Sequence, residues 1–286
     1  MRTSLCWLAF ALAFAMASAH AQNPYFVTYD HHLEDPGDLE IATFSTAGVP
    51  RSPQPSFFAP ALELEYGVKK WWTSSFYLEG QSTAGDSTIF TGWRLENRFR
   101  PFRTEHAVNP VLYFEYENVN EASRIEKEIV GHATDFGEPN SESRQEHAHE
   151  LETKLILSST LRGWNIAENF IVEKNLSAAE GFEFGYAFGV ARQLGTPTGA
   201  TCRWCRQNFI AGMEVYGGLG STQQFGFHDT AHYVAPALAW RFTPTTTLRI
   251  SPAIGVTHGA APLLLRIGCE YEVEDFGKRV TAFFRR

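Results

Sequence analysis

The residues best placed to bind a metal ion stand in the run Glu146-His147-Ala148-His149-Glu150. In an extended segment the side chains of His147 and His149 point the same way, and two such imidazoles suit one transition-metal ion. A solvated polar segment at the base of a loop is the competing interpretation. His147 and His149 are therefore the candidate metal ligands, and we expect no organic cofactor.

Signals of enzymatic chemistry are missing from the sequence. It contains no G-x-S-x-G nucleophile motif and no glycine-rich phosphate loop. The formal net charge of −8 and the pI of about 5.7 argue against a nucleic-acid partner, because proteins that bind phosphate backbones usually carry a basic patch. These observations favour a protein that is not an enzyme.

Charged side chains recur at every second position of apolar segments. Between residues 110 and 119, Leu112 and Phe114 alternate with Glu115 and Glu117. A period of two indicates a β-strand with two unlike faces. About twelve such segments follow one another between residues 38 and 274, so the chain is predicted to be all-β.

Three features favour a membrane barrel over a soluble sandwich or a lipocalin-like binder. The predicted strands span 9–13 residues, which suits a tilted membrane crossing. Short connections alternate with long ones, of which the one near 120–149 is charged, and residues 121–130 within it favour one or two helical turns. Tryptophans adjoin the short connections, as in a periplasmic aromatic girdle: Trp71, Trp72, Trp164 and Trp240. The prediction is an antiparallel up-and-down transmembrane β-barrel of about 12 strands.

The chain divides into four segments. Residues 1–21 read as a signal peptide, with an apolar core before Ala19-His20-Ala21. Residues 22–37 form an N-terminal segment, in which His31-His32 has no evident role, and residues 38–276 form the barrel. Residues 277–286 are a C-terminal tail. Either this tail forms more strand, or the chain has a different terminal signal from other barrels.

Export predicts an oxidising compartment for the cysteines. Cys202 and Cys205 form a CxxC pair that suits a small disulfide loop, half of a metal site or a redox pair. The sequence has no second CxxC to complete a four-cysteine zinc site, and Arg206 stands where haem attachment needs a histidine. We therefore predict a structural disulfide between Cys202 and Cys205.

The cleavable signal, the period-two strands and the alternating turn lengths resemble those of bacterial outer-membrane β-barrel proteins. The resemblance covers about residues 30–280, and residues 91–100 are similar to a group of uncharacterised exported barrels. It implies location in the outer membrane, with the lipid bilayer and small solutes as partners. The residues after Phe276 depart from the family pattern, in which an aromatic residue often closes the last strand.

In such a barrel the apolar face meets lipid and the charged face lines the lumen. We predict that the lumen-lining residues are Glu63, Glu65, Arg94, Glu96, Arg98, Glu115, Glu117, Glu152, Lys154, Arg249, Arg266, Glu270 and Glu272. Glu–Arg ladders that fill a small barrel, a path that prefers cations and a catalytic carboxylate pair are three interpretations of this set.

The function predicted from these features is a small pore or passive transporter for small solutes, with cations as the candidate class. Two alternatives stay open. One is a non-conducting structural or binding barrel, and the other is an outer-membrane enzyme acting at the barrel rim on lipid or a surface polymer.

Overall fold

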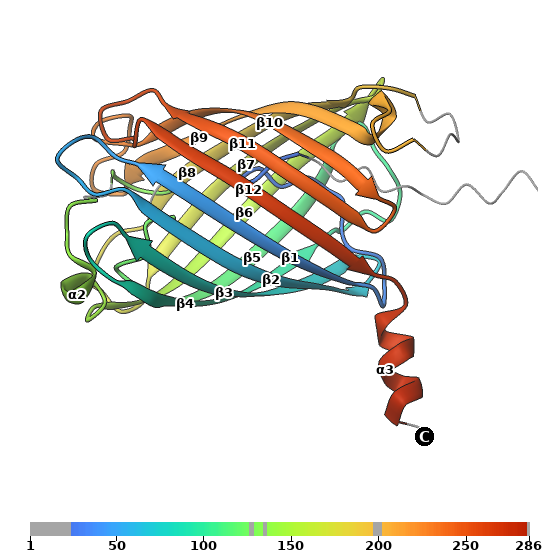
Figure 1. Cartoon of the computed structure of the whole chain (residues 1–286), viewed down its shortest axis with the longest axis horizontal. Helices are drawn as coiled ribbons and strands as arrows, with labels where there is room; N and C mark the ends of the chain where they lie inside the picture. Colours follow the sequence, from blue (N-terminus) through green and yellow to red (C-terminus); the bar gives the residue numbers. More distant parts are fainter. Residues whose placement is uncertain (1–23, 126–128, 134–135, 197–201, 285–286) are drawn as a thin grey trace, which may run out of the picture.

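The computed structural model describes residues 24–125, 129–133, 136–196 and 202–284, so the predicted signal peptide (1–21) lies outside the described residues. Twelve antiparallel strands each pair with their neighbours in sequence, and β1 pairs with β12 to close the barrel (Figure 1). This confirms the predicted fold class and strand number. The strands are β1 (Leu39–Val49), β2 (Phe57–Lys69), β3 (Trp72–Thr83), β4 (Thr88–Phe99), β5 (Asn109–Asn120), β6 (His147–Leu161), β7 (Trp164–Asn175), β8 (Glu183–Gln193), β9 (Phe209–Ser221), β10 (His232–Thr243), β11 (Thr246–Gly255) and β12 (Leu263–Val273).

Only short helices accompany the strands in the described part of the chain: α2 (Asn140–Ser143), the 3-10 turn η2 (Arg206–Asn208) and α3 (Phe276–Phe284). None of them is long and apolar enough to cross a membrane. The described part of the predicted C-terminal tail belongs to α3, which begins three residues after the end of β12. The tail therefore does not extend the strand.

The two faces of the strands have the inverted polarity of a membrane barrel. On β5, Leu112 and Phe114 are 43% and 44% exposed on the outside, whereas Glu115 is 1% exposed. On β6, Leu155 is 42% exposed and Lys154 is buried. Apolar side chains thus form the outer surface, and ionic side chains are enclosed within the ring.

The three two-residue connections, β2–β3, β6–β7 and β10–β11, lie at the barrel end where β1 begins and β12 ends, whereas the β4–β5 and β8–β9 connections at the same end are longer. The β6–β7 turn consists of Arg162 and Gly163, whose φ angles of 52° and 79° are those that a two-residue hairpin of type I′ needs. The tryptophans adjacent to these turns stack with their neighbours, as the rings of Trp71 and Trp72 do at 6.2 Å. Because short turns are expected on the periplasmic side of such barrels, we call this the periplasmic end.

The connection between β5 and β6 folds over the opposite end. Val130 and Gly131 form isolated bridges with Gly185 on β8 and Gly220 on β9. Of the segment 121–130, for which the sequence favoured helical turns, residues 121–125 form turns and bends and Val130 forms a bridge, while residues 126–128 lie outside the described residues. Ile125 and Ile129 instead pack against a buried cluster inside the barrel, which draws this connection into the external mouth.

The inverted polarity predicts that an outward charge destabilises the barrel. Phe114→Arg should lower the free energy of unfolding in vesicles by roughly 2–4 kcal/mol, because it places a cation against acyl chains. Phe102→Arg is a matched control, since Phe102 is also 44% exposed but lies in the connection between β4 and β5 at the periplasmic end. Denaturant titration that gave equal losses for both variants would contradict the assignment of a lipid-facing belt.

Candidate functional site

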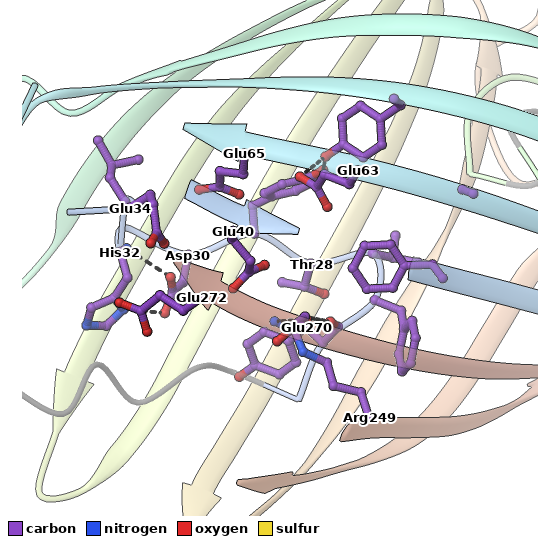
Figure 2. Close-up of a pocket in the computed structure, with 18 of the residues that line it drawn as sticks. Thr28, Asp30, His32, Glu34, Glu40, Glu63, Glu65, Arg249, Glu270 and Glu272 are labelled. Atoms are coloured by element: carbon purple, nitrogen blue, oxygen red, sulfur yellow. Dashed lines mark hydrogen bonds and ion pairs between the residues drawn. The ribbon is translucent and has the colours of Figure 1, made fainter. Parts of the chain in front are cut away.

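The N-terminal residues 24–38, which we call the plug, run from the inside of the barrel, where residues 24–34 lie, to its rim at residues 35–38. Tyr25, Val27 and His31 are almost completely buried. The side chains of Thr28, Asp30 and His32 lie among the inward-facing carboxylates of β1, β2 and β12 in Figure 2. The sequence defined this segment but did not place it in the lumen.

A single buried carboxylate on β9 holds the plug by its backbone. Glu214 accepts hydrogen bonds from three consecutive amide groups, those of Phe26 (2.8 Å), Val27 (2.9 Å) and Thr28 (2.7 Å). The Glu214 side chain is not exposed at all. Hydrogen bonds to an ionised acceptor are stronger than neutral ones, so this contact is the principal clamp on the plug.

Two asparagines of β7 bind the next residues of the plug. The Asn169 amide accepts from the Tyr29 N–H (2.7 Å) and donates to the Tyr29 carbonyl (2.8 Å), as a neighbouring strand would. Asn165 donates to the Asp30 carboxylate at 2.8 Å and accepts from the Tyr25 hydroxyl at 3.1 Å. These contacts satisfy backbone polar groups that would otherwise be buried without partners.

The His31-His32 pair, which the sequence left without a role, joins the plug to the wall. The His31 backbone N–H donates to Ser158 Oγ at 2.9 Å, and its Nε2 lies 3.0 Å from the Glu105 carboxylate. His32 Nδ1 lies 2.7 Å from Asp30. Burial alone would raise the pKa of Asp30. The charge and hydrogen bond of His32 outweigh this effect and lower the pKa of Asp30 to about 2. Burial likewise disfavours charged His32, but Asp30 raises its pKa.

A row of carboxylates runs around the inner wall. The strand register places inward-facing residues of eight adjacent strands, β12 and β1 to β7, opposite one another, and seven of them are glutamates. The row is Glu272, Glu40, Glu65, Ser75, Glu96, Glu115, Glu152 and Glu173. We call it the glutamate row. Like charges directly opposite one another are destabilising, so the row needs nearby cations or water.

Arginines and a lysine compensate part of this charge. Arg98 pairs with Glu65 and with Glu96, the second at 2.7 Å. Arg94 bridges Glu79 and Glu115 at 2.8 Å to each. The wall pairs on other strands are Lys154–Glu152 at 2.8 Å and Arg249–Glu270 at 2.5 Å. Buried charges are tolerated when paired in this way. The Arg94, Arg249 and Arg98–Glu65 pairs connect different strands, whereas Lys154–Glu152 and Arg98–Glu96 lie within one strand.

A cavity of about 1130 Å³ remains between the plug and the wall. Its lining extends from Pro244 in the β10–β11 turn to Ile125 and Ile129 of the inward-folded connection. Thirteen Asp and Glu residues line it against seven Lys and Arg residues, an excess of six carboxylates among the described residues. The cavity is therefore strongly acidic, and this acidity favours cations over anions.

The predicted lumen-lining residues fall into two groups. Ten of them line the cavity: Glu63, Glu65, Arg94, Arg98, Glu152, Lys154, Arg249, Arg266, Glu270 and Glu272. Glu96, Glu115 and Glu117 are fully buried beside the cavity. Sequence reasoning missed the contributions of Asn165, Asn169 and Ser158, whose only signal is that they occupy alternate positions of their strands.

The candidate ligands outside the lumen lie on β6 and near β9. His147 and His149 share the outer face of β6, and His149 Nδ1 lies 2.7 Å from the Tyr116 hydroxyl. Elsewhere in the described chain, groups of three metal-binding side chains are brought together, such as Asp30, His31 and His32. The metal site at His147 and His149 stays a prediction. Cys202 and Cys205 form a disulfide.

Comparison with known proteins supports the fold alone. No model of a protein family matches the sequence, and no curated protein is similar to it. The COG4313 outer membrane channel from Pseudomonas putida F1 superposes with a TM-score of 0.55 at 12% identity, covering 87% of this chain and 99% of that one. The KdgM porin and the NanC porin superpose with TM-scores of 0.50, at 7% and 12% identity, over 82% of this chain and 98% and 100% of theirs. The chain has the fold of bacterial outer-membrane β-barrels.

Docking of the plug is predicted to weaken with rising pH through Glu34. Burial, with Glu65, Glu272 and Asp38 nearby, raises the pKa of Glu34 to about 9, although Arg98 opposes the shift. In a released plug the pKa returns to about 4.5. Between about pH 4.5 and about pH 9, the docked plug therefore binds one more proton, on Glu34, than the released plug. Docking weakens as pH rises through this range.

Glu34→Gln should remove this dependence, because the amide stays neutral. Hydrogen exchange of residues 25–35, corrected for the intrinsic effect of pH, should show that protection falls with pH in the wild type and changes less in the variant. Asp35→Asn, at the exposed neighbouring position, should behave like the wild type. A wild-type plug whose protection did not fall as pH rose would disprove the role of Glu34.

Proposed function

We propose that the protein is an outer-membrane pore for the passive passage of small cationic solutes. The observation that carries the proposal is the excess of six carboxylates among the described residues that line the cavity. Narrow passages with low-dielectric walls concentrate ions of opposite sign, and rings of Asp and Glu select cations. The outward apolar belt supports insertion of the barrel in a lipid bilayer.

The charge of the cavity distinguishes this chain from a neighbour of the same fold. One structure of the KdgM porin, with a TM-score of 0.50 and 8% identity, contains a disordered oligogalacturonate, which is a polyanion. The glutamate row and the cavity excess would repel such a solute. Likeness of fold therefore supports passage through the barrel, while the nature of the solute follows from this chain's own side chains.

The plug and the inward-folded connection limit what can pass. The plug occupies the lumen through the Glu214 clamp and the β7 asparagines, and Ile125 and Ile129 close the external side with Phe57 and Phe136. Passage of anything larger than a small ion thus requires the plug to move. The pore is proposed to be narrow at rest and wider when the clamp releases.

Cation preference should depend on the acidic lining of the cavity. Glu40→Gln with Glu63→Gln should lower the potassium-to-chloride permeability ratio in planar bilayers by about two-fold or more, because two carboxyl groups leave the lumen. Glu63 accepts from Tyr77 at 2.6 Å, and a glutamine oxygen can retain that bond. Glu168→Gln, on the outer face of β7, is the matched control. An unchanged ratio in a conducting barrel would refute the selectivity proposal.

Release of the clamp should raise conductance. Glu214→Gln turns an amide group toward backbone N–H donors, so at least one hydrogen bond to a charged acceptor is lost, at a cost of roughly 1.5–3 kcal/mol in plug docking. Single-channel recordings should show more frequent or larger openings, and hydrogen exchange of residues 25–29 should accelerate. Glu168→Gln again serves as control. If neither readout changed, the plug would not limit conduction.

A further inference from the structure

The C-terminal helix α3 has an apolar face that is mostly exposed in the described structure. Phe276, Val280, Phe283 and Phe284 stand at intervals of four, three and one residues, which places them on one stripe of a helix about 100° wide. Val280, Phe283 and Phe284 are 37%, 75% and 81% exposed. A stripe of this kind requires an apolar partner.

The start of α3 is fixed to the periplasmic rim of the barrel. The ring of Phe276 contacts that of Tyr66 on β2, with 6.3 Å between centroids. The Asp275 N–H donates to Asp38 Oδ1 at 2.6 Å, and the Gly277 N–H donates to the Gly37 carbonyl at 2.9 Å. Because Tyr66 belongs to the outer, lipid-side face of β2, α3 begins where the bilayer surface meets the barrel.

The direction of α3 matches the plane of the membrane. Figure 1 shows the helix leaving the end of β12 and running across the barrel axis, away from the wall. A bilayer that surrounds the barrel is perpendicular to that axis. The helix therefore extends parallel to the bilayer surface, at the level of the periplasmic aromatic residues, and does not point into the periplasm.

We propose that α3 is an interfacial anchor that lies in the headgroup layer of the periplasmic leaflet. Phe283 and Phe284 enter the acyl boundary, while Lys278, on the opposite side of the helix, and Arg279, at its flank, face phosphates and water. The lipid surface is favoured over a second copy or a periplasmic protein, because the apolar stripe continues the lipid-facing surface at Tyr66. Lys278 pairs with Asp275 at 2.6 Å, which leaves Arg279 to complement anionic headgroups. The inference rests on the proposed membrane location.

Spin labels would test this placement. In a Cys269→Ser background, cysteines replace Lys278, Val280, Thr281, Phe283 or Phe284 one at a time, and each labelled barrel is placed singly in a nanodisc containing phosphatidylglycerol. We expect labels at 280, 283 and 284 to be more accessible to oxygen, and labels at 278 and 281 more accessible to a water-soluble nickel complex. Equal nickel accessibility at all five positions would overturn the proposal.

Trypsin cleavage supplies a second readout that does not depend on labels. Phe283→Ser with Phe284→Ser should increase the rate of cleavage after Lys278 and Arg279 in nanodiscs several-fold, because the helix leaves the interface. Ala282→Ser, on the polar side, should have the wild-type rate. Equal rates in all three proteins would also overturn the proposal.

The barrel itself is monitored in the same samples by its heat-modifiable shift in gels. A shifted, inserted barrel with a water-exposed α3 would disprove the anchor alone. A chain that failed to insert would disprove the membrane location and the anchor together. A folded barrel in which labels on α3 of two chains approached each other in larger vesicles would assign the apolar face to a second copy, and so overturn the lipid assignment.

Discussion

Closure of β1 onto β12 is the constraint on which the rest of the molecule depends. A closed ring has no free strand edge, so each strand pairs with a neighbour on both sides and the strands can cross lipid. Closure also gives every strand one outward and one enclosed face. Because alternate residues are ionic, closure forces glutamates of neighbouring strands into direct opposition inside a space of limited width.

The glutamate row shows how that crowding is relieved. Glu40 lies between Glu272 and Glu65 in the strand register, an arrangement that would be unfavourable on an open sheet. Part of the charge is balanced by Arg98 and Arg249, which reach across strands. The other carboxylates of the row face a cavity large enough for water. Their mutual repulsion is relieved there by water and cations, so the lumen attracts cations.

Period-two alternation was sufficient to predict the barrel, its strand number and its polarity, because each strand repeats the same signal. Alternation also identified which side chains point inward, such as Glu115 and Arg94. It could not identify partners, since the register between strands depends on the whole ring. The role of residues 24–38 was out of reach for a related reason: a segment without periodicity binds through its backbone, and its partners Glu214 and Asn169 lie far away in the sequence.

The chemistry of the clamp bears on whether the plug can move. Glu214 holds the plug through three backbone N–H groups and not through a lysine or arginine. A buried ion pair leaves an uncompensated charge when it breaks, and that makes its separation costly. Release of the plug leaves instead neutral amides that water can satisfy and a carboxylate facing a lumen that admits water. The acidic lining then gains one more anion at the moment the passage widens, so opening and cation attraction increase together.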